Sequence, residues 1–262
     1  MNSRCVALAL LSVISFVSQA NGADVFLQTS PVPIIAGSTP YIFPVSWQVG
    51  PVWARCDALH VGERTRTRRV LDRAVSKYPR RVLQPHLSTV YVMHRLSYSG
   101  VTAAGTNSRT NVYPANRGPA AGYTDAWIEM TFHAEFSSIL LRNNPYCLDT
   151  TAWQRQNGPY FRYGVSGVDA IKHKKAGTRF DESLHEKGFL YQYATSTLEN
   201  DFNTIASQLF LGDEQFWDVV RKYPRVRAKV VLAIDFYRRI DPTMNVSFFH
   251  SQIPGYSRRG SR

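Results

Sequence analysis

The stretch from Thr124 to Asn143 has the most regular apolar pattern in the chain. Its apolar side chains recur at the 3.6-residue period of an α-helix and form one stripe of Ile128, Phe132, Phe136, Ile139 and Leu140. Thr124 is a suitable N-cap, Asp125 places an acidic charge in the first turn, and Pro145 ends the run. We therefore predict one central helix here, and its apolar stripe requires other elements to pack around it.

Shorter patterns precede this helix. Asp24 to Trp53 is rich in Pro, Gly, Ser and β-branched residues, which favours an extended N-terminal arm packed on the core. Apolar positions between Gly62 and Tyr78 have helical spacing. Leu87 to Tyr98 is dominated by β-branched and aromatic residues and predicts a strand, and Thr110 to Pro114 predicts a short edge strand.

The C-terminal half is predicted to be mostly helical. Residues 144–187 lack a clear period and are expected to form long loops. Three helical patterns follow them, at Leu198–Leu211, Glu214–Tyr223 and Val226–Arg239. A small sheet before these helices makes the predicted fold class α+β. About 240 residues without a Ser/Gly linker predict a single domain over residues 23–262.

Residues 1–22 have the three parts of a cleavable signal peptide. Arg4 precedes an apolar run from Cys5 to Val17, and the small residues of Ser18–Ala20 or Ala20–Gly22 offer cleavage sites. The apolar run is too short to cross a bilayer as a helix, and no later run reaches the necessary length. We expect an exported protein, secreted or periplasmic, that has no membrane span.

Cys56 and Cys147 are the cysteines that remain after this segment is removed. In an oxidising compartment they either pair and close a long loop, or remain as two buried thiols. Their spacing is not that of a Cys-x-x-Cys redox or zinc motif.

The formal charge is +12, from 31 Lys and Arg residues against 19 Asp and Glu residues. The basic residues concentrate in Arg64–Arg81, Lys172–Lys175 and Arg258–Arg262. Such clusters are either solvated faces or surfaces that attract an acidic polymer. The sequence contains no recognised nucleic-acid motif, and aromatic residues do not alternate with the basic runs as a base-stacking surface requires.

The segment from Phe132 to Ile139 aligns with the zinc motif His-Glu-x-x-His. In that motif two imidazoles one helical turn apart hold Zn²⁺, and the glutamate activates the metal-bound water. Here Glu135 keeps its place, but Ala134 and Ser138 stand where the motif has its two histidines.

Around this motif the chain resembles a family of exported bacterial zinc-binding metallopeptidases related to the zincins. The resemblance covers about two-thirds of the mature chain, through Tyr78-Pro79, the strand near Val90, Gly100–Tyr113, His133–Asn143, Gly188–Ala194 and Glu199–Phe202. It implies a zincin-like fold, a protein or peptide substrate, and Glu135 as general base. It also implies a metal contact from the later helix, by Glu199 or Asp201.

The metal ligands remain open. His133 shares a helix face with Ser137 rather than with positions 134 and 138, so it is either a substitute ligand or a structural core histidine. With Glu199 and Asp201 it makes one candidate metal set, and a ligand from elsewhere is sought among His94, His173 and His185. Because both motif imidazoles are replaced, zinc is predicted to be absent or weakly bound.

The two glutamates also have structural interpretations. Ser196 and Glu199 have the spacing of a helix capping box, which requires no metal. Glu135 lies between Phe132 and Phe136, where partial burial would raise its pKa and suit it to acid–base chemistry. Pairing with an arginine is the alternative.

Two functions follow from these patterns. The first is a metal-dependent hydrolase of proteins or peptides in which Glu135 is catalytic. The second is a catalytically inactive zincin-like domain that acts as a secreted or cell-envelope binding module for acidic partners.

Overall fold

The computed structural model of the protein describes residues 24–28 and 31–256. The signal peptide predicted at residues 1–22 and the basic tail predicted at residues 258–262 lie outside these residues.

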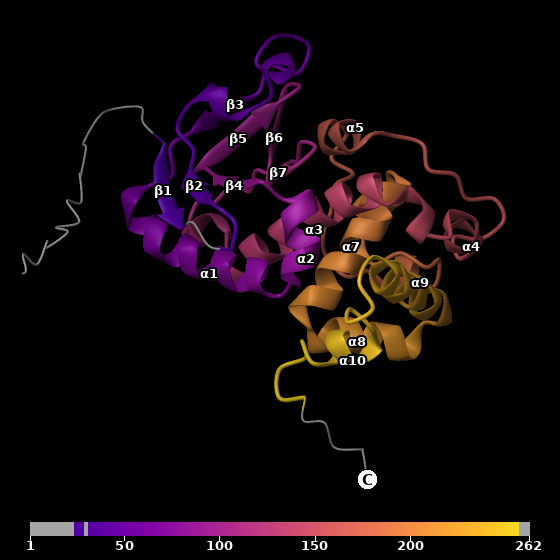
Figure 1. Ribbon diagram of the computed structural model, residues 1–262. Coiled ribbons are helices and arrows are strands. Elements are labelled where there is room, and N and C mark those ends of the chain that lie inside the picture. The colour runs from indigo at the N-terminus through magenta and orange to yellow at the C-terminus, as the bar shows by residue number, and fades with distance from the viewer. Residues whose placement is uncertain (1–23, 29–30, 257–262) are drawn as a thin grey trace, which may run out of the picture.

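The predicted central helix is α3 (Asp125–Asn143). The Thr124 side chain accepts a hydrogen bond from the Trp127 backbone N–H at 3.1 Å, as an N-cap does. The apolar stripe has no exposed surface at Ile128, Phe132, Phe136, Ile139 and Leu140. Figure 1 shows α3 between the strands with α1 (Arg64–Ser76) on one side and the C-terminal helices on the other. The helix is therefore buried along more than one face, and this burial decides where its polar residues point.

Two small sheets lie on the N-terminal side of α3. The first has the order β1-β2-β4-β7, with β1 antiparallel and the other three strands parallel, at Val25–Gln28, Ile34–Ala36, Thr89–Val92 and Asn111–Val112. The second is antiparallel with the order β3-β5-β6, at Arg55–Asp57, Arg95–Tyr98 and Val101–Ala103. The N-terminal arm contributes β1 and β2 to the first sheet, and β7 is an edge strand as expected.

The single strand predicted from Leu87 to Tyr98 is wrong. This segment forms two strands, β4 and β5, that belong to different sheets. The chain leaves the first sheet at Met93, which forms an isolated bridge with Ala115, and enters the second at Arg95. The apolar pattern continues through this point because each strand buries side chains in its own core, so the pattern does not mark the break.

Residues 144–187, predicted as long loops, contain short helices. These are η5 (Pro145–Cys147), α4 (Thr150–Arg155), α5 (Gly167–Lys172) and α6 (Glu182–His185). Another short helix outside the predictions is α2 (Arg80–His86). Segments of this length show too little of a helical period to be recognised, although Asp149, Ser166 and Asp181 each cap the helix that follows.

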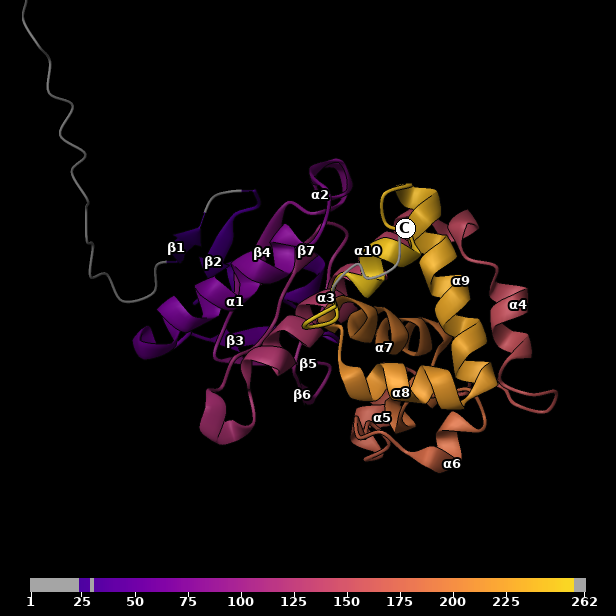
Figure 2. The ribbon, with the colours of Figure 1, turned by 90° about the horizontal axis from the view of Figure 1, so that it is seen from below.

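The C-terminal helices agree with their predictions within a few residues. They are α7 (Leu198–Leu211), α8 (Glu214–Lys222) and α9 (Pro224–Ile240), followed by α10 (Val246–His250). Figure 2 shows them gathered on the side of the molecule opposite the sheets, where α9 runs beside α4. The fold is thus mixed α and β, with small sheets and a helical C-terminal half. Among the described residues, the search for a helix long and apolar enough to cross a membrane finds none.

Candidate functional site

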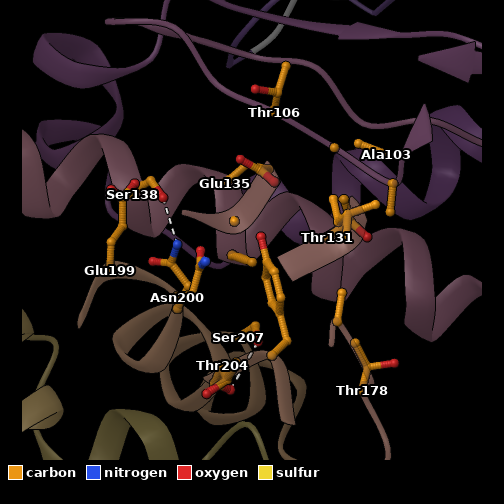
Figure 3. Close-up of a pocket in the computed structure, with 18 of the residues that line it drawn as sticks. Ala103, Thr106, Thr131, Glu135, Ser138, Thr178, Glu199, Asn200, Thr204 and Ser207 are labelled. Atoms are coloured by element: carbon orange, nitrogen blue, oxygen red, sulfur yellow. Dashed lines mark hydrogen bonds between the residues drawn. The ribbon is translucent and has the colours of Figure 1, made fainter. Parts of the chain in front are cut away.

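A cleft of about 630 Å³ lies between the second sheet, α3 and α7. One wall is formed by β6 and the segment that follows it to Asn107, and α5 closes the far side. α3 contributes Thr131, Ala134, Glu135 and Ser138 to the lining. Figure 3 shows Glu135 and Ser138 on α3 facing the α7 residues Glu199 and Asn200. The cleft is therefore built around the helix that carries the degenerate zinc motif.

Gly105 allows the wall after β6 to approach α3 closely. A Cβ atom at this position would lie 2.6 Å from Cγ2 of Thr131 and 3.0 Å from Oε1 of Glu135. Any larger residue would push the wall away from the helix. This approach also places Asn107, whose Nδ2 donates a 2.7 Å hydrogen bond to Oε2 of Glu135.

Glu135 is the carboxyl group whose ionisation the cleft changes most. Burial raises its pKa to about 7, the hydrogen bond from Asn107 opposes this rise, and the negative charge of Glu199 adds to it. Near neutral pH the group is therefore divided between a neutral form, which donates a hydrogen bond, and a charged form. The predicted rise in its pKa is confirmed, while the alternative of an arginine pair is not formed. The nearest guanidinium, Arg142, instead donates to Oδ1 of Asn107 at 2.6 Å.

Glu199 lies in the cleft lining and is not part of a capping box. The N-cap of α7 is Thr197, one residue later than predicted, and its side chain accepts from the Asn200 N–H. Ser196 instead donates to the backbone carbonyl of Tyr193. The Glu199 side chain is 48% exposed in the cleft and forms a long ion pair of 3.9 Å with Arg142.

The two positions where the zinc motif has histidines also face the cleft. Ala134 and Ser138 both line it, as helical geometry predicts for residues one turn apart. Oγ of Ser138 accepts a 2.6 Å hydrogen bond from Nδ2 of Asn203 on α7. The other amide atom, Oδ1 of Asn203, is buried and has no hydrogen-bond partner in the described part of the protein. A buried acceptor without a partner is costly, so a ligand with a suitable donor would stabilise this wall.

The donors of the cleft do not suit a zinc ion. Zinc sites in proteins take three or four ligands, mostly imidazole or thiolate, whereas this cleft offers carboxyl, amide and hydroxyl groups. Over residues 24–28 and 31–256, no group of three or more His, Cys, Asp and Glu side chains is placed to hold a metal.

His133, the first member of the predicted metal set, belongs to the core. Its side chain has no exposed surface, and its Nδ1 lies 3.0 Å from the Tyr78 hydroxyl. Nε2 lies 3.6 Å from Oε1 of Glu129, and the ring stacks on Phe210. Burial lowers the pKa of His133 to about 4, which keeps the ring neutral at physiological pH. The position of His133 therefore supports the interpretation as a structural core histidine.

Asp201, the third member, is also in the core. Its carboxylate is fully buried and its Oδ2 accepts hydrogen bonds from Nζ of Lys229 at 2.6 Å, the Tyr163 hydroxyl at 2.5 Å and Nε1 of Trp153 at 2.8 Å. The candidate set of His133, Glu199 and Asp201 is therefore not brought together. Helical residues two positions apart point about 200° apart, and on α7 this turns Asp201 towards Lys229 of α9 while Glu199 faces the cleft.

The more distant candidates lie outside the cleft lining. His94 stacks on His60 with ring centroids 3.9 Å apart, and His173 is exposed at the end of α5. His185 is buried, with Nε2 3.0 Å from the Leu190 carbonyl. None of the three is among the residues that line the cleft.

The predicted disulfide is not formed. Cys56 and Cys147 are both free. Cys56 belongs to β3 and packs in the core of the second sheet, where its Sγ donates to the Thr39 carbonyl. Cys147 packs against the main core instead. Cys56 and Cys147 are therefore two partly buried free thiols, which was the alternative to the disulfide.

Two amides of the site were not anticipated from the sequence. Asn107 lies in the Gly/Thr/Asn-rich stretch after β6, which has no periodic pattern. Asn203 carries a usable signal, because it follows Glu199 by one helical turn and so shares its face of α7.

Comparisons with protein-family models, with curated proteins and with solved structures found no match to this chain.

Replacing Glu135 by glutamine is expected to stabilise the protein at alkaline pH. The folded-state pKa of about 7 lies above the ordinary value of 4.5, so ionisation of Glu135 opposes folding. This cost is absent below pH 4.5, grows between pH 4.5 and 7, and is complete above 7. Allowing for the partial exposure of the side chain, Glu135→Gln should raise the free energy of unfolding by about 2 kcal/mol at pH 8 and by little at pH 4.5.

Urea denaturation across this pH range measures the difference between variant and wild type. Glu129→Gln is the matched control, because the bonds and charges of His133 and Lys77 outweigh burial and hold the pKa of Glu129 at about 2. That variant should lose stability at pH 8. Parallel pH profiles for Glu135→Gln and wild type would contradict the raised pKa.

Proposed function

We propose that the protein is an exported, zincin-like binding domain whose cleft holds a segment of polypeptide without hydrolysing it. The observation that carries this proposal is that Ala134 and Ser138 stand at the positions of both motif imidazoles, in a cleft that is open and carries several polar side chains. The resemblance to zinc metallopeptidases supplies the class of ligand. The loss of the metal donors removes the chemistry that the same resemblance implies.

The polar groups of the cleft fit a peptide unit. In its neutral form Glu135 donates a hydrogen bond, and a peptide carbonyl would accept it. Oδ1 of Asn203 is a buried acceptor without a partner, and a peptide N–H would satisfy it. Tyr98 and Tyr193 also line the cleft as neutral hydroxyls, because burial and the nearby Glu135 raise the pKa of both. These groups suit an uncharged stretch of main chain.

Peptide binding to the cleft can be measured with a fluorescein-labelled library of uncharged random octapeptides. Wild-type protein should bind it saturably in fluorescence anisotropy. Ala134→Phe should weaken binding at least tenfold, because a phenyl ring at a lining position occupies part of the cleft. Val231→Phe adds the same ring on α9, at a residue that is 61% exposed and outside the cleft, and should bind as wild type does.

Three outcomes would overturn the proposal. One is no saturable binding by the wild type, and another is equal binding by wild type and Ala134→Phe. The third is cleavage of the library, seen by mass spectrometry, that Glu135→Gln abolishes. This last result would instead establish a hydrolase that uses Glu135.

A further inference from the structure

A run of exposed basic residues borders the cleft on the α5 side. α5 lies against β6, as Figure 1 shows, and its residues Gly167, Val168 and Ile171 line the cleft. The same segment then carries four exposed cations, Lys172, Lys174, Lys175 and Arg179. The acidic residues nearest to them in sequence are Asp169 and Asp181, whose carboxylates accept 2.7 Å hydrogen bonds from Ser166 and Ser183. Two carboxylates against four cations leave a positive rim, which we call the α5 rim (residues 172–179).

In the larger basic cluster, on α1 and α2, several of the cations are paired with carboxylates. The carboxylates come from α3, from the start of α1 and from the end of α9, in the pairs Arg66 with Glu63 and Asp125, Arg73 and Lys77 with Glu129, and Arg81 with Asp241. These are structural ion pairs that hold α1 to its neighbours. Part of the basic sequence there therefore serves the fold, whereas the exposed cations that follow the cleft-lining residues of α5 are those of the α5 rim.

The backbone at Lys174 adds a second observation. Its φ of 57° lies in the left-handed region, and the N–H of Lys175 donates to the carbonyl of Ala170 at 2.7 Å. This pattern ends α5 in the way that helices usually end with glycine at the left-handed position. Lysine has no conformational advantage there, so the fold places a charged side chain at a position that favours glycine.

The opposite side of the cleft is also basic at its edge. Arg142 is half exposed and reaches Asn107 and the Ser108 carbonyl at 2.6 and 3.0 Å. The acidic groups Glu135 and Glu199 lie inside the cleft between these edges. A ligand that crosses the cleft therefore passes the carboxyl groups of Glu135 and Glu199 and then meets a positive border.

We propose that the polypeptide held in the cleft has an acidic flank that lies on the α5 rim, next to the uncharged segment that enters the cleft. This inference rests on the proposed peptide-binding function. The geometry places the flank beside α5 because the lining residues of α5 and the cations follow one another within a single short segment. Opposite charges across a solvated rim contribute mainly to selection between ligands and to the rate of association.

The test uses the uncharged octapeptide library extended by a tail of four aspartates or of four lysines. At about 50 mM salt, where exposed charges are weakly screened, the acidic library should bind at least tenfold more tightly than the basic one. The difference should shrink at about 0.5 M salt. Lys174→Glu with Lys175→Glu should remove or reverse the preference. Arg68→Glu with Arg80→Glu makes the same change in net charge at exposed residues of α1 and α2 and should preserve it.

The outcomes separate this inference from the function on which it rests. If no library binds, including the uncharged one, the proposed function fails. If the uncharged library binds and both tailed libraries bind equally well, only the acidic flank is excluded. If the α1 and α2 control variant removes the preference as fully as the rim variant does, the preference comes from the net charge of the protein, and the assignment to the α5 rim is wrong.

Discussion

Asp201→Ala is expected to lower the free energy of unfolding by about 3–5 kcal/mol, because it leaves the ammonium group of Lys229 buried without its counter-charge. Both side chains have no exposed surface, and their charged atoms lie 2.6 Å apart. Lys229 also lies over the ring of Phe189, with Nζ 4.1 Å from the ring centroid. The loss would be measured by urea denaturation at pH 7.

Two further variants serve as controls for this result. Glu199→Ala removes a carboxylate two residues earlier on the same helix, and should change stability by less than about 0.5 kcal/mol because its side chain is 48% exposed. Asp201→Leu combined with Lys229→Met removes both charges and should recover more than half of the loss. Trp153 and Tyr163 would still lack their acceptor, so full recovery is not expected.

A loss below about 1 kcal/mol for Asp201→Ala would contradict the structural role of the carboxylate. The same result would return Asp201 to consideration as a ligand that faces a metal or a substrate. The comparison with Glu199 therefore tests which of the two acidic residues of α7 serves the cleft and which serves the core.

The central helix could be predicted because two kinds of signal agree in it. The apolar stripe of α3 matches its buried side, and Thr124 and Pro145 mark its ends. Helical geometry also separates His133 and Ser137 from Ala134 and Ser138. The structure confirms this separation: His133 and Ser137 are buried in the core, while Ala134 and Ser138 line the cleft.

Periodicity alone does not show what a polar residue meets inside the protein. Asp201 and Lys229 are 28 residues apart, and nothing near either of them in sequence indicates that they pair. The basic run on α1 was similarly ambiguous, because its partners Asp125 and Glu129 come from α3. The roles of these charges depend on which helices become neighbours, and this is decided by packing across the whole core.

The local breaks were missed for a related reason. The chain passes from β4 to β5 without a turn residue, since both strands remain apolar on their buried sides. The bounds of α7 agree with the prediction, but the capping box placed its N-cap one residue early, because Ser196 and Thr197 are both good N-cap residues and only the contact of Ser196 with Tyr193 distinguishes them. Where two neighbouring residues are equally suitable as an N-cap, tertiary contacts decide which of them forms it.

Ala134→His, Ser138→His and Asn203→Glu together are expected to create a zinc site in the cleft, with a dissociation constant on the order of 1 µM or lower. Positions 134 and 138 are one helical turn apart and both line the cleft. Position 203 is next to them, since Nδ2 of Asn203 lies 2.6 Å from Oγ of Ser138. Two imidazoles and one carboxylate are the protein ligands of a tetrahedral zinc site with one open position.

Titration with Co²⁺ provides a spectroscopic readout of the tetrahedral geometry, and calorimetry with Zn²⁺ gives the affinity. The control is Arg227→His with Val231→His, which places the same pair of imidazoles one turn apart on the exposed face of α9. A pair without a third ligand should bind zinc at least a hundredfold more weakly than the triple variant. If the triple variant binds no better than this surface pair, the three positions do not converge and the zincin-like arrangement of the cleft is wrong. If it binds as expected, the three positions converge as the ligands of a zinc site do, and the wild-type cleft lacks only the ligand side chains at these positions.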